Sequence, residues 1–177
     1  MSNNKKGIIA VIVFLAVVAN FIGFSFDNIH WRQYLPKGII GVSIPYEAVE
    51  YKGHHYHVYD DFVASWNDAE DFCESKGGHL VAINDEEENN RVYKIMRDSG
   101  FKTAYIGFYD PKATGVWGWI NGEPVSYTHW MSDTTPAPVR NYQYALYLED
   151  KDGRWGMDTF TRHSPDDKIA FICEWDE

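Results

Sequence analysis

The chain has 177 residues, of which 45% are hydrophobic and 16% aromatic. This length and composition are sufficient for one domain with a packed core and additional segments. The formal net charge is −10 at pH 7, so we expect no nucleic-acid partner, because phosphate binding needs a basic face.

An uncharged, apolar stretch at residues 7–26 follows Lys5 and Lys6. About 20 apolar residues suffice to span a bilayer, so we predict a single-pass signal anchor, with residues 1–6 in the cytoplasm because the lysines precede it. The alternative is a signal peptide that is cleaved near Ala19 and gives a secreted protein. Both hypotheses place the rest of the chain outside the cytoplasm, and the membrane is a partner only in the first.

Residues 27–46 are short and mixed in composition, and we interpret them as a juxtamembrane spacer before a domain at 47–177. The domain begins with two runs of alternating polar and apolar residues, Val49–Tyr51 and Tyr56–Tyr59, on either side of Gly53. This pattern predicts a β-hairpin.

Two helices are predicted next. Ser65 with an acidic residue three positions later is typical of a helix start, and the pattern predicts a helix over 66–76 that ends at two glycines. A second helix, capped by Asn84 or Asp85, is expected to end near Asp98. A short strand is predicted between the helices, at 79–83.

Further short strands follow a dense aromatic pattern: 104–108, 116–120, 144–148, 154–158 and 169–175. The stretch 131–141 shows no periodicity and is expected to form a long irregular loop. The two cysteines, Cys73 and Cys173, would be free thiols in a cytosolic protein, whereas behind an export segment they are expected to form one disulfide.

Three sequence segments resemble those of the C-type lectin-like domain family. Tyr105-Ile106-Gly107-Phe108 resembles the "WIGL" motif, and Trp117 to Trp130 resembles the Trp-x-Trp-x-x-Gly-x-Pro-x-x-Tyr-x-x-Trp segment. The predicted first helix resembles the family's W-x-x-A-x-x-x-C helix. The resemblance covers roughly 47–177 and implies an α+β fold: two helices flanking small antiparallel sheets, with a long irregular loop. It also implies the Cys73–Cys173 pairing.

The sugar-binding members of the family hold calcium, and the resemblance indicates which residues of this chain stand at the positions of their calcium ligands. Calcium needs 6–8 oxygen ligands, and this chain has Thr135-Pro136-Ala137 or Ala137-Pro138-Val139 at the family's Glu-Pro-Asn triplet. The family's Trp-Asn-Asp motif becomes Trp155-Gly156-Met157-Asp158, longer by one residue or displaced. Asp158 alone keeps a place as a metal ligand, so we predict no cofactor, with calcium binding through displaced ligands as the alternative.

Two other metal sites are hypotheses. Among His54, His55 and His57, the last two can share a strand face and bind a transition metal; solvent-facing histidines are the ordinary alternative. Glu88, within the run Glu86–Glu88, could form a structural calcium site with Glu174, as in some family members. The ordinary alternative is a solvated helix start stabilised by the helix dipole.

No sequence motif of an enzyme is recognisable. We therefore predict a non-enzymatic, extracytoplasmic recognition module that binds a glycan or protein ligand without the standard calcium site. The alternatives are a calcium-dependent lectin and an enzyme on the same fold. The predicted ligand-binding residues surround the long loop: Arg140, Asn141, Tyr142, Tyr147, Glu149 and Asp158.

Overall fold

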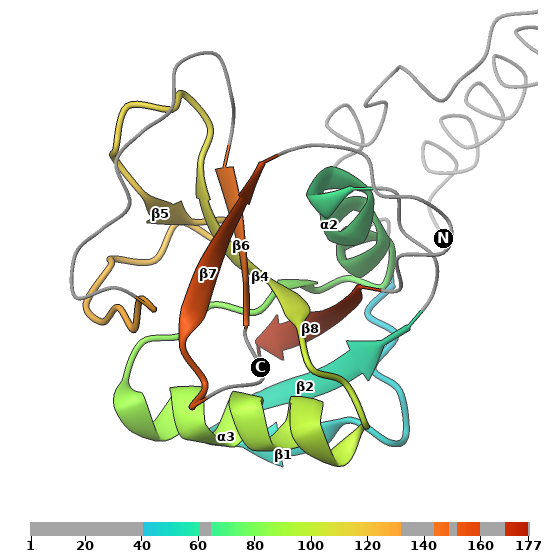
Figure 1. Cartoon of the computed structure of the whole chain (residues 1–177). Coiled ribbons are helices and arrows are strands. Elements are labelled where there is room, and N and C mark those ends of the chain that lie inside the picture. The colour runs from blue at the N-terminus through green and yellow to red at the C-terminus, as the bar shows by residue number, and fades with distance from the viewer. Residues whose placement is uncertain (1–40, 61–64, 132–143, 149–151, 160–168, 177) are drawn as a thin grey trace, which may run out of the picture. The chain divides into compact units, whose positions relative to one another are not determined.

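The computed structural model describes residues 41–60, 65–131, 144–148, 152–159 and 169–176, with the backbone alone for 144–148, 158 and 159. All of them belong to one compact unit, Ile40–Glu177. The helices and strands follow in this order (Figure 1): β1 Val49–Tyr51, β2 His54–Tyr59, α2 Trp66–Ser75, β3 His79–Leu80, α3 Glu86–Asp98, β4 Ala104–Asp110, β5 Gly118–Trp119, β6 Tyr144–Leu148, β7 Trp155–Thr159 and β8 Ala170–Asp176.

The described strands form one mixed sheet of eight strands with the path β1-β2-β8-β4-β6-β7, to which β3 is joined through β8 and β5 through β4. The expectation of small antiparallel sheets was therefore wrong. Strand β8 lies between β2 and β4, antiparallel to the first and parallel to the second, and so joins the pairs on either side of it. Local sequence periodicity does not indicate which distant strands become neighbours.

Strand β8 belongs to two hydrophobic clusters at once. Ala170 and Ile172 are buried in a cluster with Val92 and Met96 of α3. Phe171 and Cys173 face the other side and are buried in a cluster with α2. Alternate residues of a strand point to opposite faces of a sheet, so one strand is buried on both faces and α2 and α3 flank the sheet, as predicted.

Both helix starts follow the predicted capping pattern. The Ser65 hydroxyl accepts a hydrogen bond from the backbone N–H of Asp68 at 3.3 Å, and α2 begins at the next residue after Ser65. The Asp85 carboxylate accepts from the backbone N–H of Glu88 at 2.7 Å and caps α3. Such side chains satisfy backbone donors that lack a partner within the helix.

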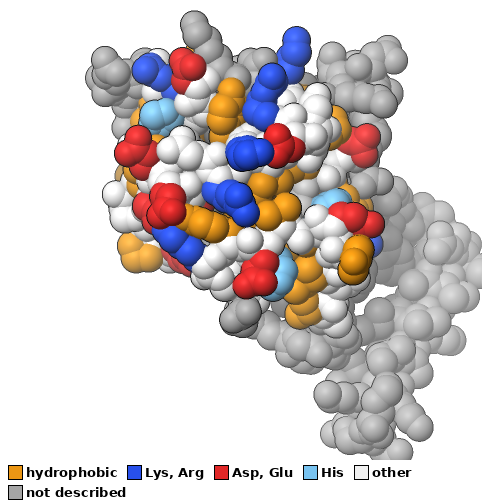
Figure 2. Space-filling model, turned by 90° about the horizontal axis from the view of Figure 1, so that it is seen from below, with side chains coloured by type: hydrophobic (Ala, Val, Ile, Leu, Met, Phe, Trp, Pro, Cys, Tyr) orange, Lys and Arg blue, Asp and Glu red, His pale blue; other side chains and the backbone are white. Residues whose placement is uncertain are grey.

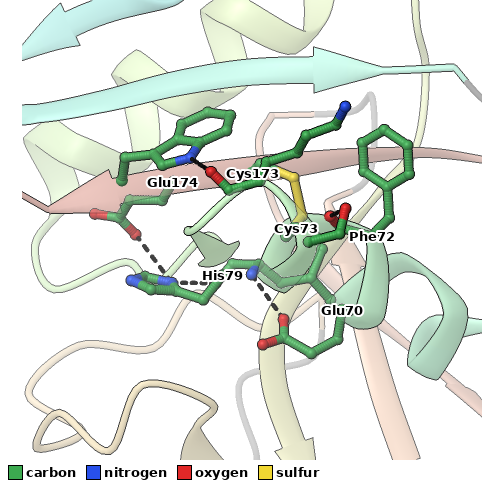
Figure 3. Close-up of a disulfide and its surroundings, with 10 residues drawn as sticks. Glu70, Phe72, Cys73, His79, Cys173 and Glu174 are labelled. Carbon is green, nitrogen blue, oxygen red and sulfur yellow. Dashed lines mark hydrogen bonds and ion pairs between the residues drawn. A yellow bond between two sulfur atoms is a disulfide. The ribbon is translucent and has the colours of Figure 1, made fainter. Parts of the chain in front are cut away.

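Cys73 and Cys173 form a disulfide, as predicted, which joins α2 to β8 (Figure 3). The same region requires a glycine. A Cβ atom added to Gly107 would lie 2.5 Å from the carbonyl oxygen of Leu80, so the backbones of β3 and β4 can approach each other only at a residue without a side chain. This explains the glycine of the Tyr105–Phe108 motif.

The strand predicted at 79–83 is shorter, and β3 spans only His79–Leu80. The reason lies at Ala82, whose backbone N–H donates to a side-chain oxygen of Glu174 at 2.8 Å rather than to a strand carbonyl. Neither described helix has the length and apolar composition that a membrane span requires. The predicted anchor at 7–26 lies outside the described residues.

Candidate functional site

The sheet holds the residues on both sides of the stretch 132–143. Before it, the backbone N–H of Met131 donates to the Trp155 carbonyl at 2.9 Å, and the Trp155 N–H donates to the His129 carbonyl at 2.7 Å. After it, Tyr144 pairs with Asp110 of β4 and with Thr159 of β7. Both ends of the predicted ligand-binding stretch are therefore anchored on a hydrogen-bonded scaffold.

Trp155 is the centre of that scaffold and is fully buried. Its ring lies 5.5 Å from the rings of Phe108 and Trp119 and 6.3 Å from that of Trp130, measured between centroids. Its indole N–H donates to the side-chain oxygen of Asn89 on α3 at 2.9 Å. Aromatic contacts and a satisfied polar group fix β7 against the rest of the domain.

Four of the six predicted ligand-binding residues, Arg140, Asn141, Tyr142 and Glu149, lie outside the described residues. The other two lie on adjacent strands. Tyr147 of β6 pairs with Gly156 of β7, and Asp158 pairs with Ala145, so Tyr147 and Asp158 are diagonal neighbours in the ladder. Their role in binding stays a prediction.

The β6–β7 ladder also fixes the residues that follow Trp155. Its register is continuous from Trp155 to Thr159, without an additional residue at this point. Gly156 has no side chain, and the Met157 side chain is half-buried against the cluster that contains Val92 and Ile172. Positions 156 and 157, which directly follow the tryptophan as the amide and carboxylate of the family motif do, therefore carry no side-chain oxygen ligand.

A group of carboxylates lies on the α3 side of the sheet. Glu88 is buried, and its two oxygens accept hydrogen bonds from the Tyr56 hydroxyl at 2.6 Å and from the backbone N–H of Asn84 at 2.7 Å. Glu174 is also buried; one oxygen accepts from the Ala82 N–H at 2.8 Å. These bonds fix the connection between β3 and α3 against β8.

The electrostatics of this group centre on Glu174. Burial raises the pKa of Glu174 well above its ordinary value, and the charges of Glu88, Asp176 and Glu123 add to the increase, while the hydrogen bond from Ala82 opposes it. Glu123 reaches the group through a hydrogen bond from the Asn84 side-chain amide. Sequence reasoning missed Glu123, because its approach depends on the turn after β5 and has no local signal.

Of the predicted glutamates, the structure brings Glu88 and Glu174 together and leaves Glu86 and Glu87 exposed. Glu87 pairs instead with Lys52, 2.9 Å away. A group of carboxylates suits calcium chemically, but both oxygens of Glu88 and one oxygen of Glu174 already accept hydrogen bonds from the protein. A calcium role for Glu88 and Glu174 stays a hypothesis.

The histidines are arranged differently from the prediction. His54, not His55 or His57, meets acidic groups: its Nδ1 lies 2.8 Å from Glu174 and 3.0 Å from Asp176. His57 lies against the ring of Tyr59, 4.5 Å between centroids, and burial lowers its pKa. Within the described residues, the one group of three or more metal-ligating side chains is His54, Glu174 and Asp176. Figure 2, which shows the molecule from below, has histidine side chains beside acidic ones.

The family model of the Lectin C-type domain matches residues 63–175. The chain belongs to this family. Its C-type lectin domain is 38% identical over 129 residues to the alpha subunit of snaclec bitiscetin from Bitis arietans, a match that covers 70% of this chain and 88% of that protein. The domain is a recognition module, since proteins of this fold are generally binding modules without enzymatic activity.

A second relative of the C-type lectin domain is the secretory phospholipase A2 receptor of Mus musculus, 35% identical over 74 residues. That match covers 42% of this chain and 5% of the receptor, and the chain spans 65% and 33% of two other relatives. The solved structure of a calcium-independent type II antifreeze protein has a TM-score of 0.62 at 25% identity, covering 77% of this chain and 96% of that one.

Proposed function

We propose that the C-type lectin domain binds a glycan or a protein surface without calcium at the family's standard site. The observation that carries this proposal is β7, where Gly156 and the half-buried Met157 follow Trp155 and supply no side-chain oxygen. Calcium held at 6–8 oxygen ligands needs several carboxylates or amides there. The structural neighbour described as calcium-independent supports the same interpretation.

The proposed ligand surface consists of the stretch 131–141 together with Tyr142, Tyr147, Glu149 and Asp158. Long loops on a rigid scaffold commonly carry binding function, and this stretch begins at Met131, which is bonded to Trp155. An arginine fork, an amide and aromatic faces can hydrogen-bond sugar hydroxyls or contact a protein. We propose no catalytic step for this surface.

The domain is proposed to lie outside the cytoplasm, held by the segment 7–26 with 27–46 as a spacer. The disulfide supports an oxidising compartment. External protease added to intact cells should release the domain and leave the anchor in the membrane fraction. A soluble native protein with its N-terminus near residue 20 would instead establish signal-peptide cleavage.

The test of binding uses the full chain, immobilised, against a glycan array and against detergent-solubilised surface proteins. Each measurement is made once with calcium and once with a chelator. The expected result is a bound ligand whose amount is equal in the two buffers. Loss of binding in the chelator would contradict the calcium-free proposal and favour the calcium-dependent alternative, and turnover of a bound glycan would favour an enzyme.

A further inference from the structure

Two histidines and two carboxylates converge on one face of the sheet, at the end of β8. His54 of β2 pairs directly with Asp176 of β8, and His79 of β3 pairs with Glu174. β2 and β3 lie on opposite edges of β8. Because successive residues of a strand alternate between faces, the register sends all four side chains to the α3 side.

The contacts between these side chains are short. His54 Nδ1 lies 2.8 Å from Glu174 Oε1 and 3.0 Å from Asp176 Oδ1, and His79 Nε2 lies 3.2 Å from Asp176 Oδ2. One ligand atom each from His54, Glu174 and Asp176 falls within 4.8 Å of the others. Figure 3 shows the Glu174 and His79 side chains turned toward each other beside the disulfide.

His79 contacts the second oxygen of Asp176 from the β3 side of β8. His79 Nδ1 lies 2.9 Å from the Leu80 carbonyl, which can only accept, so Nδ1 carries the proton. The other ring nitrogen, Nε2, lies 3.2 Å from Asp176 Oδ2, so His79 holds the carboxylate of Asp176 in place. Residues that contact a metal-ligating carboxylate orient it, and their replacement weakens metal binding.

The local charge favours a divalent ion. Within the described residues, Glu174 and Asp176 form ion pairs with these two histidines alone and with no lysine or arginine. Glu88 and Glu123 add further negative charge nearby. The site also has an entry path, because the side chains of His54 and Asp176 are 32% and 49% exposed.

We propose that His54 Nδ1, Glu174 and Asp176 bind one Zn²⁺ ion, with a water molecule in the fourth position, and that the ion ties β2 to the end of β8. Imidazole and carboxylate ligands select zinc over calcium, which takes oxygen alone. Tetrahedral zinc with bonds of about 2.0–2.1 Å separates its ligands by roughly 3.3–3.4 Å. The separations of 2.8 Å and 3.0 Å between His54 Nδ1 and the two carboxylates therefore need to widen by a few tenths of an ångström, and the three ligand atoms lie within 4.8 Å of one another.

The test uses the full chain in a mild detergent, without a polyhistidine tag, titrated calorimetrically with ZnCl₂. The expected result is one equivalent of Zn²⁺ bound, undiminished by excess Ca²⁺. Substituting Co²⁺ should give the intense visible absorption of a tetrahedral site. His54→Ala and Asp176→Asn should each weaken Zn²⁺ binding by at least about tenfold, and His79→Ala by about 10–100-fold.

His57→Ala is the matched control, because His57 lies on β2 three residues from His54 but on the other face, and it should bind Zn²⁺ like the unmodified chain. Glu88→Gln should likewise keep zinc binding, since Glu88 is not a proposed ligand. Near-ultraviolet circular dichroism verifies that each variant is folded. No Zn²⁺ binding by the unmodified chain, equal competition by Ca²⁺, or binding that depends on His57 rather than His54 would overturn the proposal.

Discussion

Asn89 of α3 accepts a hydrogen bond from the indole N–H of Trp155, 66 residues later in the chain, at 2.9 Å in the buried core. The Asn89 amide also donates to the carbonyl of Gly153 at 3.1 Å. One side chain therefore holds both the turn before β7 and the central tryptophan of the scaffold under the proposed ligand surface.

Asn89→Ala should lower the free energy of unfolding by about 1–3 kcal/mol, because it leaves the buried indole N–H and the Gly153 carbonyl without partners. Trp155→Ala should cost more, about 3–5 kcal/mol, since it also removes a fully buried ring. Denaturant unfolding followed by fluorescence measures both. An Asn89→Ala variant as stable as the unmodified chain would show that the bond contributes nothing.

The Cys73–Cys173 disulfide closes a loop with a sequence separation of 100 residues. Replacing both cysteines by alanine should lower stability by about 3–5 kcal/mol, because the unfolded chain regains the entropy that the cross-link removes. Thermal unfolding of the double variant and of the reduced protein should give similar decreases. A double variant with unchanged stability would contradict this explanation.

Ligand binding should depend on Arg140 and Tyr142, which lie outside the described residues. Arg140→Ala and Tyr142→Ala are each expected to weaken binding of the ligand found on the array by about tenfold or more, since aromatic and arginine contacts contribute most of the energy at interfaces. The unfolding free energy should stay within about 0.5 kcal/mol of the parent value. Lys112→Ala, an exposed substitution at the turn after β4, is the control and should bind normally.

Glu70 gives the domain a pH-dependent stability. Its carboxylate accepts from the Leu80 N–H at 2.8 Å (Figure 3), and burial raises the pKa of Glu70 to about 8, with smaller contributions from Glu74 and Asp71. Because the folded pKa is above the unfolded one, the folded state holds more protons between pH values of about 4.5 and 8. Stability from this group is complete below that window and is lost as the pH rises through it, by up to about 1.4 kcal/mol per pH unit.

Glu70→Gln keeps an acceptor for the Leu80 N–H and removes the titration. The variant should therefore gain stability relative to the parent at pH 8 and show a flatter dependence on pH above about 5. Urea unfolding at several pH values measures the slope. Parallel pH profiles for the two proteins would show that Glu70 is not the responsible group.

Features of the fold that depend on local chemistry were predictable. The capping side chains Ser65 and Asp85 act on backbone groups three residues away, so the two helix starts were identified from sequence alone. The parallel contact between β4 and β8 was not predictable, because it pairs residues 66 positions apart, as in Ala104 with Ala170, and no local pattern marks such a partner.

The candidate sites also differ in whether local sequence or distant strand pairing determines them. Alternation on β2 allowed His54 with Tyr56, or His55 with His57, to share a face, and sequence reasoning chose the second pair. The choice depends on the register with β8, which sets His54 opposite Asp176. A single position in a strand decides which face a side chain occupies, and that register is fixed by contacts 122 residues apart.

Strand β8 has a consequence for how the domain forms during synthesis. Its partners β2, β3 and β4 are all made earlier, and its first residue to pair with β2, Phe171, is made 112 residues after its partner Tyr59. Until then both hydrophobic clusters lack the strand that closes them. Pairings so distant in sequence form slowly. The hydrophobic residues of the nascent domain therefore remain accessible to chaperones, and Cys73 remains without its disulfide partner, until β8 emerges. A ribosome-bound chain that stops before residue 170 should therefore be digested by protease under native conditions. A chain that includes β8, followed by an added linker long enough to let β8 leave the ribosome, should resist digestion.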